Sequence, residues 1–172
     1  MSQFEKYHPI LTPNYTLDWL TQTPVKNIFE LYQGNNYETS LTIKRPSSIL
    51  DTVRNVNHTM QKVMAEKELT WGITDSDSGE FLGVIKAFDL SEDTPEAKIS
   101  FVTKAQQPEE LLFQVVKRTV KFIIDHFAST KVAIHLEKDN QSVTQILKLL
   151  GFIQANQGRW VLSLTEDLKE NF

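Results

Sequence analysis

The chain has 172 residues and a formal charge of −4 at pH 7, so its overall charge gives no sign of a nucleic acid or an anionic membrane as partner. It has no cysteine, which excludes a disulfide framework, thiolate metal ligands and a cysteine nucleophile. Hydrophobic residues make up 40% and charged residues 23%, as in ordinary globular proteins, and the length suits a single domain.

The first predicted elements are a strand and a helix. Apolar residues alternate with their neighbours over 15–20, which is typical of a strand half covered by a core. Pro24 then opens a helix with apolar residues at helical spacing, and Gly34 is a natural place for it to end. We interpret residues 34–36 as a loop.

A second helix is predicted after Pro46, where Ser47 or Ser48 can cap the first turn. Its apolar residues follow one another in steps of four and three; they are Ile49, Val53, Val56, Met60 and Val63. Such residues share one face of a helix and pack that face against a core.

The pattern then changes to short apolar runs that predict strands over 69–74, 81–88 and 97–103. The first two runs are joined by Asp75-Ser76-Asp77-Ser78-Gly79, and these small polar residues favour a hairpin turn. Three consecutive strands predict an antiparallel meander.

The remaining elements are a helix from Pro108, a strand over 132–136, a helix over 140–150 that ends at Gly151, and a strand over 160–164. The order of elements predicts a mixed α/β fold. Strand, helix and strand over 97–137 form a right-handed crossover, which makes the two strands parallel neighbours. Ligands of such sheets bind where a strand end meets a helix N-terminus, and here that place is 102–110.

Two segments carry a family resemblance. The first is Trp71-Gly72-Ile73 followed by Ser78-Gly79-Glu80-Phe81-Leu82-Gly83-Val84-Ile85, and the second is Lys138-Asp139-Asn140 followed by Gly151-Phe152. In this order and spacing they resemble the GNAT superfamily of N-acetyltransferases, in particular its RimJ/RimL-like branch of ribosomal-protein alanine acetyltransferases. The similarity covers residues 15–164. It implies one GNAT-like domain over 1–172, with an N-terminal extension over 1–14 and a C-terminal tail over 165–172.

The resemblance implies that the two parallel strands part and hold acetyl-coenzyme A in the V-shaped opening between them. Backbone groups of Phe101, Val102 and Thr103 would bond the pantetheine arm. The pyrophosphate would rest on a glycine-rich turn at the start of the next helix, where bare amides and the helix dipole meet its charge. Gln106 or Gln107 would fill the leading polar position of that turn.

The sequence departs from the family pattern at this turn. Residues 104–111 contain no glycine, and Pro108 removes one amide donor. Glu109 and Glu110 occupy the first helical turn, where they satisfy the helix dipole and repel a phosphate, an effect that Lys104 offsets in part. The alternative interpretation is that residues 107–110 are an ordinary helix start, with proline first and acids behind it.

The residues for chemistry also differ from the family pattern. Acetyl transfer needs a base for the amine and an acid for the coenzyme A thiolate. The serine that the pattern places three residues after Asn140 is Val143 here. Ser142 is the nearest alternative, but we expect it to cap its helix instead. The family's glutamate position on the first parallel strand holds Lys98, and Glu96 is the candidate to replace it. Asn140 itself either contacts the cofactor or caps its helix.

Two main functions are left open. One is the transfer of an acetyl group from acetyl-CoA to a primary amine, a protein N-terminus or a small amine, by direct attack, because no cysteine is present for a covalent route. The other is a relative that kept the fold, lost the cofactor and acts as a binding or interaction module. A third option is a different acyl donor, held mainly through pantetheine. The acceptor side is expected at the first two helices and the loop 34–48, which contains Tyr37, Glu38, Lys44 and Arg45.

Other features concern metal, location and assembly. The histidines show no close spacing, so no metal site is predicted, and His135 on the second parallel strand either packs or faces the opening. Residues 1–6 lack a charged segment followed by an apolar one, and no stretch approaches about 18 apolar residues, so we expect a cytoplasmic protein without membrane or nucleic-acid partners. The acceptor, the oligomeric state and turnover itself do not follow from the sequence, and a homodimer is left open.

Overall fold

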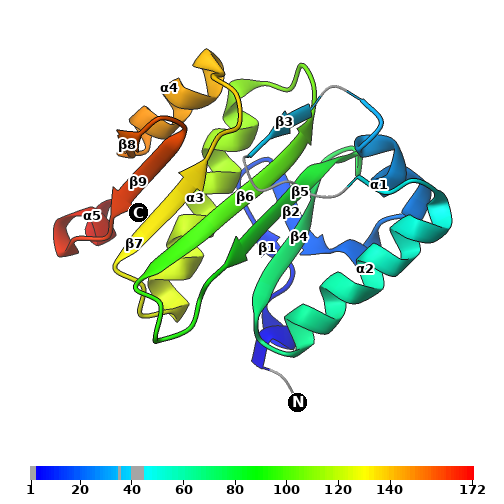
Figure 1. Ribbon diagram of the computed structural model, residues 1–172, viewed down its shortest axis with the longest axis horizontal. Helices are drawn as coiled ribbons and strands as arrows, with labels where there is room; N and C mark the ends of the chain where they lie inside the picture. Colours follow the sequence, from blue (N-terminus) through cyan, green and yellow to red (C-terminus); the bar gives the residue numbers. More distant parts are fainter. Residues whose placement is uncertain (1–2, 35, 40–44) are drawn as a thin grey trace.

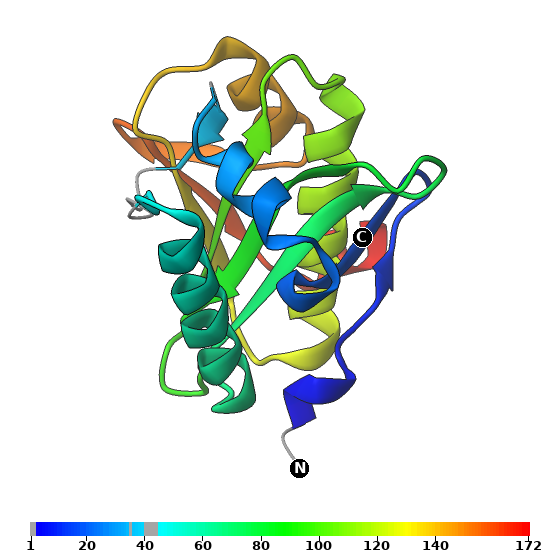
Figure 2. The ribbon, with the colours of Figure 1, turned by 90° about the vertical axis from the view of Figure 1, so that its right-hand side faces the viewer.

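The computed structural model describes residues 3–34, 36–39 and 45–172. Within these residues the chain forms a nine-stranded sheet with helices on both faces (Figures 1 and 2). The strand order is β1-β2-β4-β5-β6-β7-β9-β8, and β3 pairs with β6 beside this path. In the described sheet only β6 and β7 run parallel to each other; the other pairs are antiparallel. The predicted mixed α/β fold and its parallel strand pair are confirmed.

The strands are β1 (Ile10–Leu11), β2 (Tyr15–Trp19), β3 (Asn36–Glu38), β4 (Glu68–Asp75), β5 (Phe81–Phe88), β6 (Glu96–Lys104), β7 (Lys131–His135), β8 (Ile153–Asn156) and β9 (Arg159–Ser163). The α-helices are α1 (Val25–Leu31), α2 (Ile49–Met64), α3 (Glu109–His126), α4 (Gln141–Leu149) and α5 (Glu166–Asn171), and short 3₁₀ helices span Gln3–Lys6 and Leu20–Gln22. None of the helices that the structure describes is long and apolar enough to cross a bilayer.

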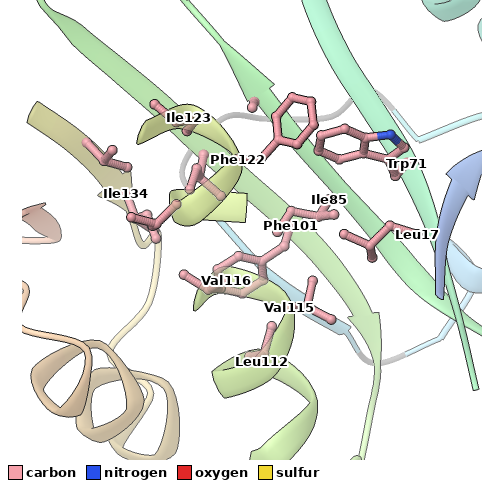
Figure 3. Packing of buried hydrophobic residues seen from close by; sticks show 14 of the residues in the cluster. Leu17, Trp71, Ile85, Phe101, Leu112, Val115, Val116, Phe122, Ile123 and Ile134 are labelled. Carbon is pink, nitrogen blue, oxygen red and sulfur yellow. The ribbon is translucent and has the colours of Figure 1, made fainter. Parts of the chain in front are cut away.

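The sheet separates two hydrophobic clusters. Alternate residues of a strand point to opposite faces, and β5 and β6 contribute side chains to both clusters. Trp71, Ile85 and Phe101 lie on the face that α3 covers, and Figure 3 shows them packed with Val115 and Phe122 of that helix. The smaller cluster lies on the face covered by α1 and α2; it contains Leu20, Ile28, Leu31, Tyr32, Val56, Phe81, Val84 and Val102. Each fully buried aliphatic or aromatic side chain stabilises the fold by about 1.5–3 kcal/mol.

Two of the residues predicted to begin or end helices do so in the structure, and one does not. Ser48 is the cap of α2, since its Oγ accepts a hydrogen bond from the backbone N–H of Asp51 at 3.0 Å. Gly151 ends the fourth helix as predicted, with a left-handed φ of 99°. Gly34 does not end α1, which already stops at Leu31, because the chain turns there through Tyr32 without a left-handed residue.

Several short elements were not predicted. Asn36 was expected in a loop but begins β3, whereas Asn35 lies outside the described residues. β8 was also missed, and β1 and α5 lie in the segments expected as the N-terminal extension and the C-terminal tail. These elements have two to six residues, too few to show a period of their own.

Candidate functional site

Strands β6 and β7 are paired only at their beginnings. Three facing pairs join them, from Glu96–Lys131 to Lys98–Ala133. Beyond these pairs β6 continues to Lys104 and β7 to His135, so the two strands separate. We call the space between them beyond the last pair the notch. The chain therefore has the kind of opening that the family resemblance implies.

The mouth of the notch is occupied by β3. The three residues of β3 face residues 102–104 of β6 in antiparallel register. The next residue, Thr39, makes an isolated antiparallel bridge to Leu136, just beyond the end of β7. β3 thus lies between the two parted strands, as Figure 1 shows near the end of β6. Among the described residues, no strand pairs with 99–101 on this edge of β6.

The three residues expected to bond pantetheine differ in what their backbone contacts. Val102 and Thr103 lie between two strands, with β5 on one side and β3 on the other. Phe101 pairs with Ile85 of β5 and has no strand on its notch side within the described chain. The side chains of all three are buried, and the Oγ1 of Thr103 has no hydrogen-bond partner among the described groups. An arm in the notch and β3 would need the same backbone edge.

The turn between β6 and α3 combines a left-handed residue, a proline and two acidic side chains. Pro108 is the N-cap residue of α3, and the exposed Glu109 and Glu110 form its first turn. Gln106 has a φ of 63°, in the region that favours glycine. The Nζ of Lys104 lies 3.4 Å from a carboxylate oxygen of Glu80. The turn therefore matches the ordinary helix start, with negative charge where a pyrophosphate would lie.

Asn140 and Ser142 lie together at the start of α4. The Oδ1 of Asn140 accepts a hydrogen bond from the backbone N–H of Val143 at 3.2 Å, so Asn140 caps the helix. The expectation that Ser142 caps this helix is wrong, because Asn140 already fills that position. Instead the hydroxyl of Ser142 donates to Glu109 Oε1 at 3.3 Å and links the starts of α4 and α3.

Glu96 lies at the closed end of the notch rather than in its opening. Its carboxylate accepts a hydrogen bond from the guanidinium of Arg159, which lowers the pKa of Glu96 below its ordinary value, although burial partly opposes this effect. Another nitrogen of Arg159 lies 3.3 Å from Nε2 of the half-buried His135. A carboxylate with a lowered pKa is a weak proton acceptor.

A cavity of about 360 Å³ lies on the face of the sheet that α1 and α2 cover. Ser100, two residues beyond the last pair of β6 with β7, lines it, so the cavity begins beside the closed end of the notch. Its other lining groups include Tyr32, whose pKa burial raises to about 12 with a smaller contribution from Glu38. An ion pair between Glu68 and Lys86, 3.5 Å apart, also lines the cavity.

A second cavity of about 280 Å³ lies at the mouth of the notch, between β3 and the start of α4. It is lined by Gly34, Asn36, Tyr37, Glu38, Arg45, Phe101, Leu136, Glu137, Lys138, Asp139, Asn140 and Val143. Part of the expected acceptor loop therefore lines the mouth of the notch. Lys44 of that loop lies outside the described residues. Within the described part of the chain, no three His, Asp or Glu side chains are grouped so that they could hold a metal ion.

Sequence reasoning found the parting of the strands and missed two features of the site. Arg159 was missed because nothing near it in the chain marks it as the partner of Glu96, 63 residues away. β3 was missed because residues 34–36 were interpreted as a loop. The alternation of Tyr37 and Thr39 with polar neighbours was the available signal.

The sequence matches the family model of the acetyltransferase (GNAT) domain over residues 15–153. No curated protein matches it. Similar solved structures include a ribosomal-protein-S5-alanine acetyltransferase from Vibrio fischeri, with a TM-score of 0.76, 8% identity and coverage of 92% of this chain and 98% of that one. Another is RimJ from Mycobacterium smegmatis with a coenzyme A disulfide, with a TM-score of 0.72, 10% identity and coverage of 93% and 87%. The spermidine/spermine N-acetyltransferase SpeG from Vibrio cholerae has a TM-score of 0.69, 14% identity and coverage of 92% and 98%. At these identities the structures show the fold alone, and the fold is the expected one.

Proposed function

Since this chain belongs to the GNAT acetyltransferase family, we propose that it transfers an acetyl group from acetyl-coenzyme A to a primary amine. The parting of β6 and β7 beyond Lys98 and Ala133 carries this proposal. An opening between parallel strands gives a thin thiol-bearing arm unpaired backbone to bond, and residues 99–101 are such a stretch. The acceptor is a protein N-terminus or a small amine, because structural relatives are named for both kinds of substrate.

The proposed reaction is direct attack of the amine on the thioester. The acceptor would reach the thioester from the cavity beside Ser100, on the face opposite α3. Positioning of the two substrates would supply much of the rate. Ser142 is our candidate for reprotonating the thiolate, and Glu96 is the weaker one because Arg159 holds its carboxylate ionised. Gln106, Gln107 and Asn140 are our candidates for contacts with the donor.

The test is acetyl transfer measured through the release of coenzyme A. The chain has no cysteine, so every thiol that appears in the assay comes from the product. We expect thiol release that requires an amine, from a panel of a peptide with N-terminal alanine, spermidine and a simple alkylamine. A ligand at 100 times its dissociation constant stabilises the native state by about 2.7 kcal/mol, so thermal unfolding reports donor binding separately. No thermal shift at millimolar acetyl-CoA would contradict the proposal.

A second candidate function is a binding module without catalysis. The occupied mouth of the notch and the acidic first turn of α3 favour it, because both oppose a bound nucleotide. The same titration separates the candidates, since a saturable shift contradicts the module. We propose a cytoplasmic location in either case.

A further inference from the structure

β3 uses backbone groups that the proposed donor would use. Its three residues add a strand to 102–104 of β6, and Thr39 extends the contact to Leu136 on the other side of the notch. A peptide strand and a pantetheine arm both bond such an edge through amide groups. The edge of β6 at 102 and 103, where the resemblance places two of the arm's three contacts, cannot bond both at once, and the free stretch 99–101 lies between β3 and the closed end of the notch. β3 and the arm therefore exclude each other.

Side-chain hydrogen bonds to the C-terminal end of α1 hold β3 in place. The amide nitrogen of Asn36 donates to the backbone oxygen of Leu31 at 2.6 Å, which ties the start of β3 to the end of α1. At the other end, Arg45 donates to the carboxylate of Glu38 at 2.6 Å and, through its second nitrogen, to the backbone oxygen of Tyr32 at 2.8 Å. Both ends of the strand are therefore anchored to the same turn.

β3 also contributes to the hydrophobic core. Tyr37, its central residue, is half-buried and packs against the larger cluster. Thr39 is 1% exposed, so the chain is buried at the point where it bridges to Leu136. Backbone pairing, anchoring side chains and an apolar contact together make β3 a part of the fold rather than an incidental neighbour of the notch.

We propose that β3 is a built-in competitor of the acyl donor: it closes the mouth of the notch, and the donor binds when β3 leaves the edge of β6. This rests on the proposed transferase function. The measured dissociation constant then equals the intrinsic one divided by the fraction of molecules with an open notch. The glycine-free turn and its two carboxylates weaken the donor's own contacts with the chain. The equilibrium between the closed notch and the donor-bound notch is therefore shifted toward the closed one.

A reversible cross-link tests the competition. Asn36 and Lys104 face each other across β3 and β6, and facing antiparallel residues have Cα atoms about 4.5–5.5 Å apart, within the range of a disulfide. In the N36C/K104C variant the two new thiols are the only ones, because the chain has no cysteine. We expect the oxidised form to bind acetyl-CoA at least tenfold more weakly than the same protein after reduction.

Loosening β3 is the complementary test. Asn36→Ala removes a neutral anchoring bond and is expected to strengthen acetyl-CoA binding by about two- to tenfold, the range for one hydrogen bond. The matched control is Asn171→Ala, which removes an amide bond to the backbone oxygen of Asp167 in α5 and should leave binding unchanged.

The outcomes separate the two proposals. If oxidised and reduced N36C/K104C bind acetyl-CoA equally well, β3 is no competitor, and the proposed donor binding stands without it. Calorimetry on the wild type, reduced N36C/K104C and Asn36→Ala tests the donor proposal itself. If none of the three proteins binds acetyl-CoA, both the proposed donor binding and the proposed competition by β3 are wrong. Weaker binding on oxidation together with stronger binding by Asn36→Ala supports both proposals.

Discussion

The ion pair of Glu96 and Arg159 ties β6 to β9 across β7, and its effect depends on pH. Because Arg159 lowers the pKa of Glu96, this carboxylate stabilises the fold above its unfolded pKa, and the contribution is lost as pH falls through the folded value. Glu96→Gln should therefore lower the free energy of unfolding by about 1 kcal/mol at neutral pH.

The difference between Glu96→Gln and wild type should shrink from neutral to acidic pH and disappear once the pH lies below the lowered pKa of Glu96, where wild-type Glu96 is protonated as well. Urea unfolding at neutral and at acidic pH measures it. Glu166→Gln is the control, since Glu166 is almost fully exposed beside Lys169 and should change stability little at either pH. An equal loss at both pH values for Glu96→Gln would show that packing, not charge, holds this carboxyl group.

Gly83 is required by the close approach of β5 to β6. A Cβ added at this position would lie 2.3 Å from the backbone oxygen of Val102 and 2.9 Å from the Cα of Thr103. Backbone atoms cannot yield as a flexible side chain does, so Gly83→Ala should destabilise the fold by about 1–3 kcal/mol. Gly34→Ala is the control, because nothing lies within 4 Å of its added Cβ. Similar midpoints of thermal unfolding for the two variants would contradict this requirement for glycine at position 83.

At the scale of elements, the start of α3 combines a favourable helix with an unfavourable anion site. Glu109 and Glu110 stabilise the positive end of the helix dipole. Replacing both by glutamine should strengthen binding of coenzyme A by about two- to fivefold per charge at low salt and lower the thermal stability slightly. The gain should shrink in high salt, because these side chains are exposed. Glu92→Gln with Asp93→Asn, on the loop between β5 and β6, should leave binding unchanged.

The start of α4 separates capping from donor contact. Asn140→Ala removes the hydrogen bond to Val143 and should lower the free energy of unfolding by about 1 kcal/mol. Asn140→Ser keeps a capping oxygen, so its stability should be close to wild type. If Asn140 also contacts the donor, both variants lose acetyl-CoA affinity, whereas a pure cap loses it in neither. Calorimetry and thermal unfolding on the same two proteins decide this.

At the scale of the whole molecule, the long elements could be predicted and the short ones could not. The stripe of α2 and the apolar runs of β4, β5 and β6 repeat often enough to reveal their period. β3 has three residues, and its pairing partner lies more than 60 residues away. Such a strand is stabilised by the edge that it joins rather than by its own sequence.

The difference between long and short elements also explains which features of the site could be predicted. The resemblance anticipated the parting of the strands because it rests on the order of long elements, which the sequence shows. It could not anticipate what fills the opening, since that depends on side chains of Asn36, Glu38 and Arg45 meeting α1. Ser142 was misassigned as a cap because both it and Asn140 are good caps, and spacing alone does not choose between them.

The three pairs that join β6 to β7 also divide the sheet mechanically. One half consists of β1, β2, β4, β5 and β6, and the other of β7, β9 and β8, each held together internally by antiparallel ladders. A force that pulls the two halves apart would separate these three residue pairs before it separates any longer ladder of the sheet. The sheet thus has inside it, beside the proposed chemistry, a joint about as short as those at its two edges.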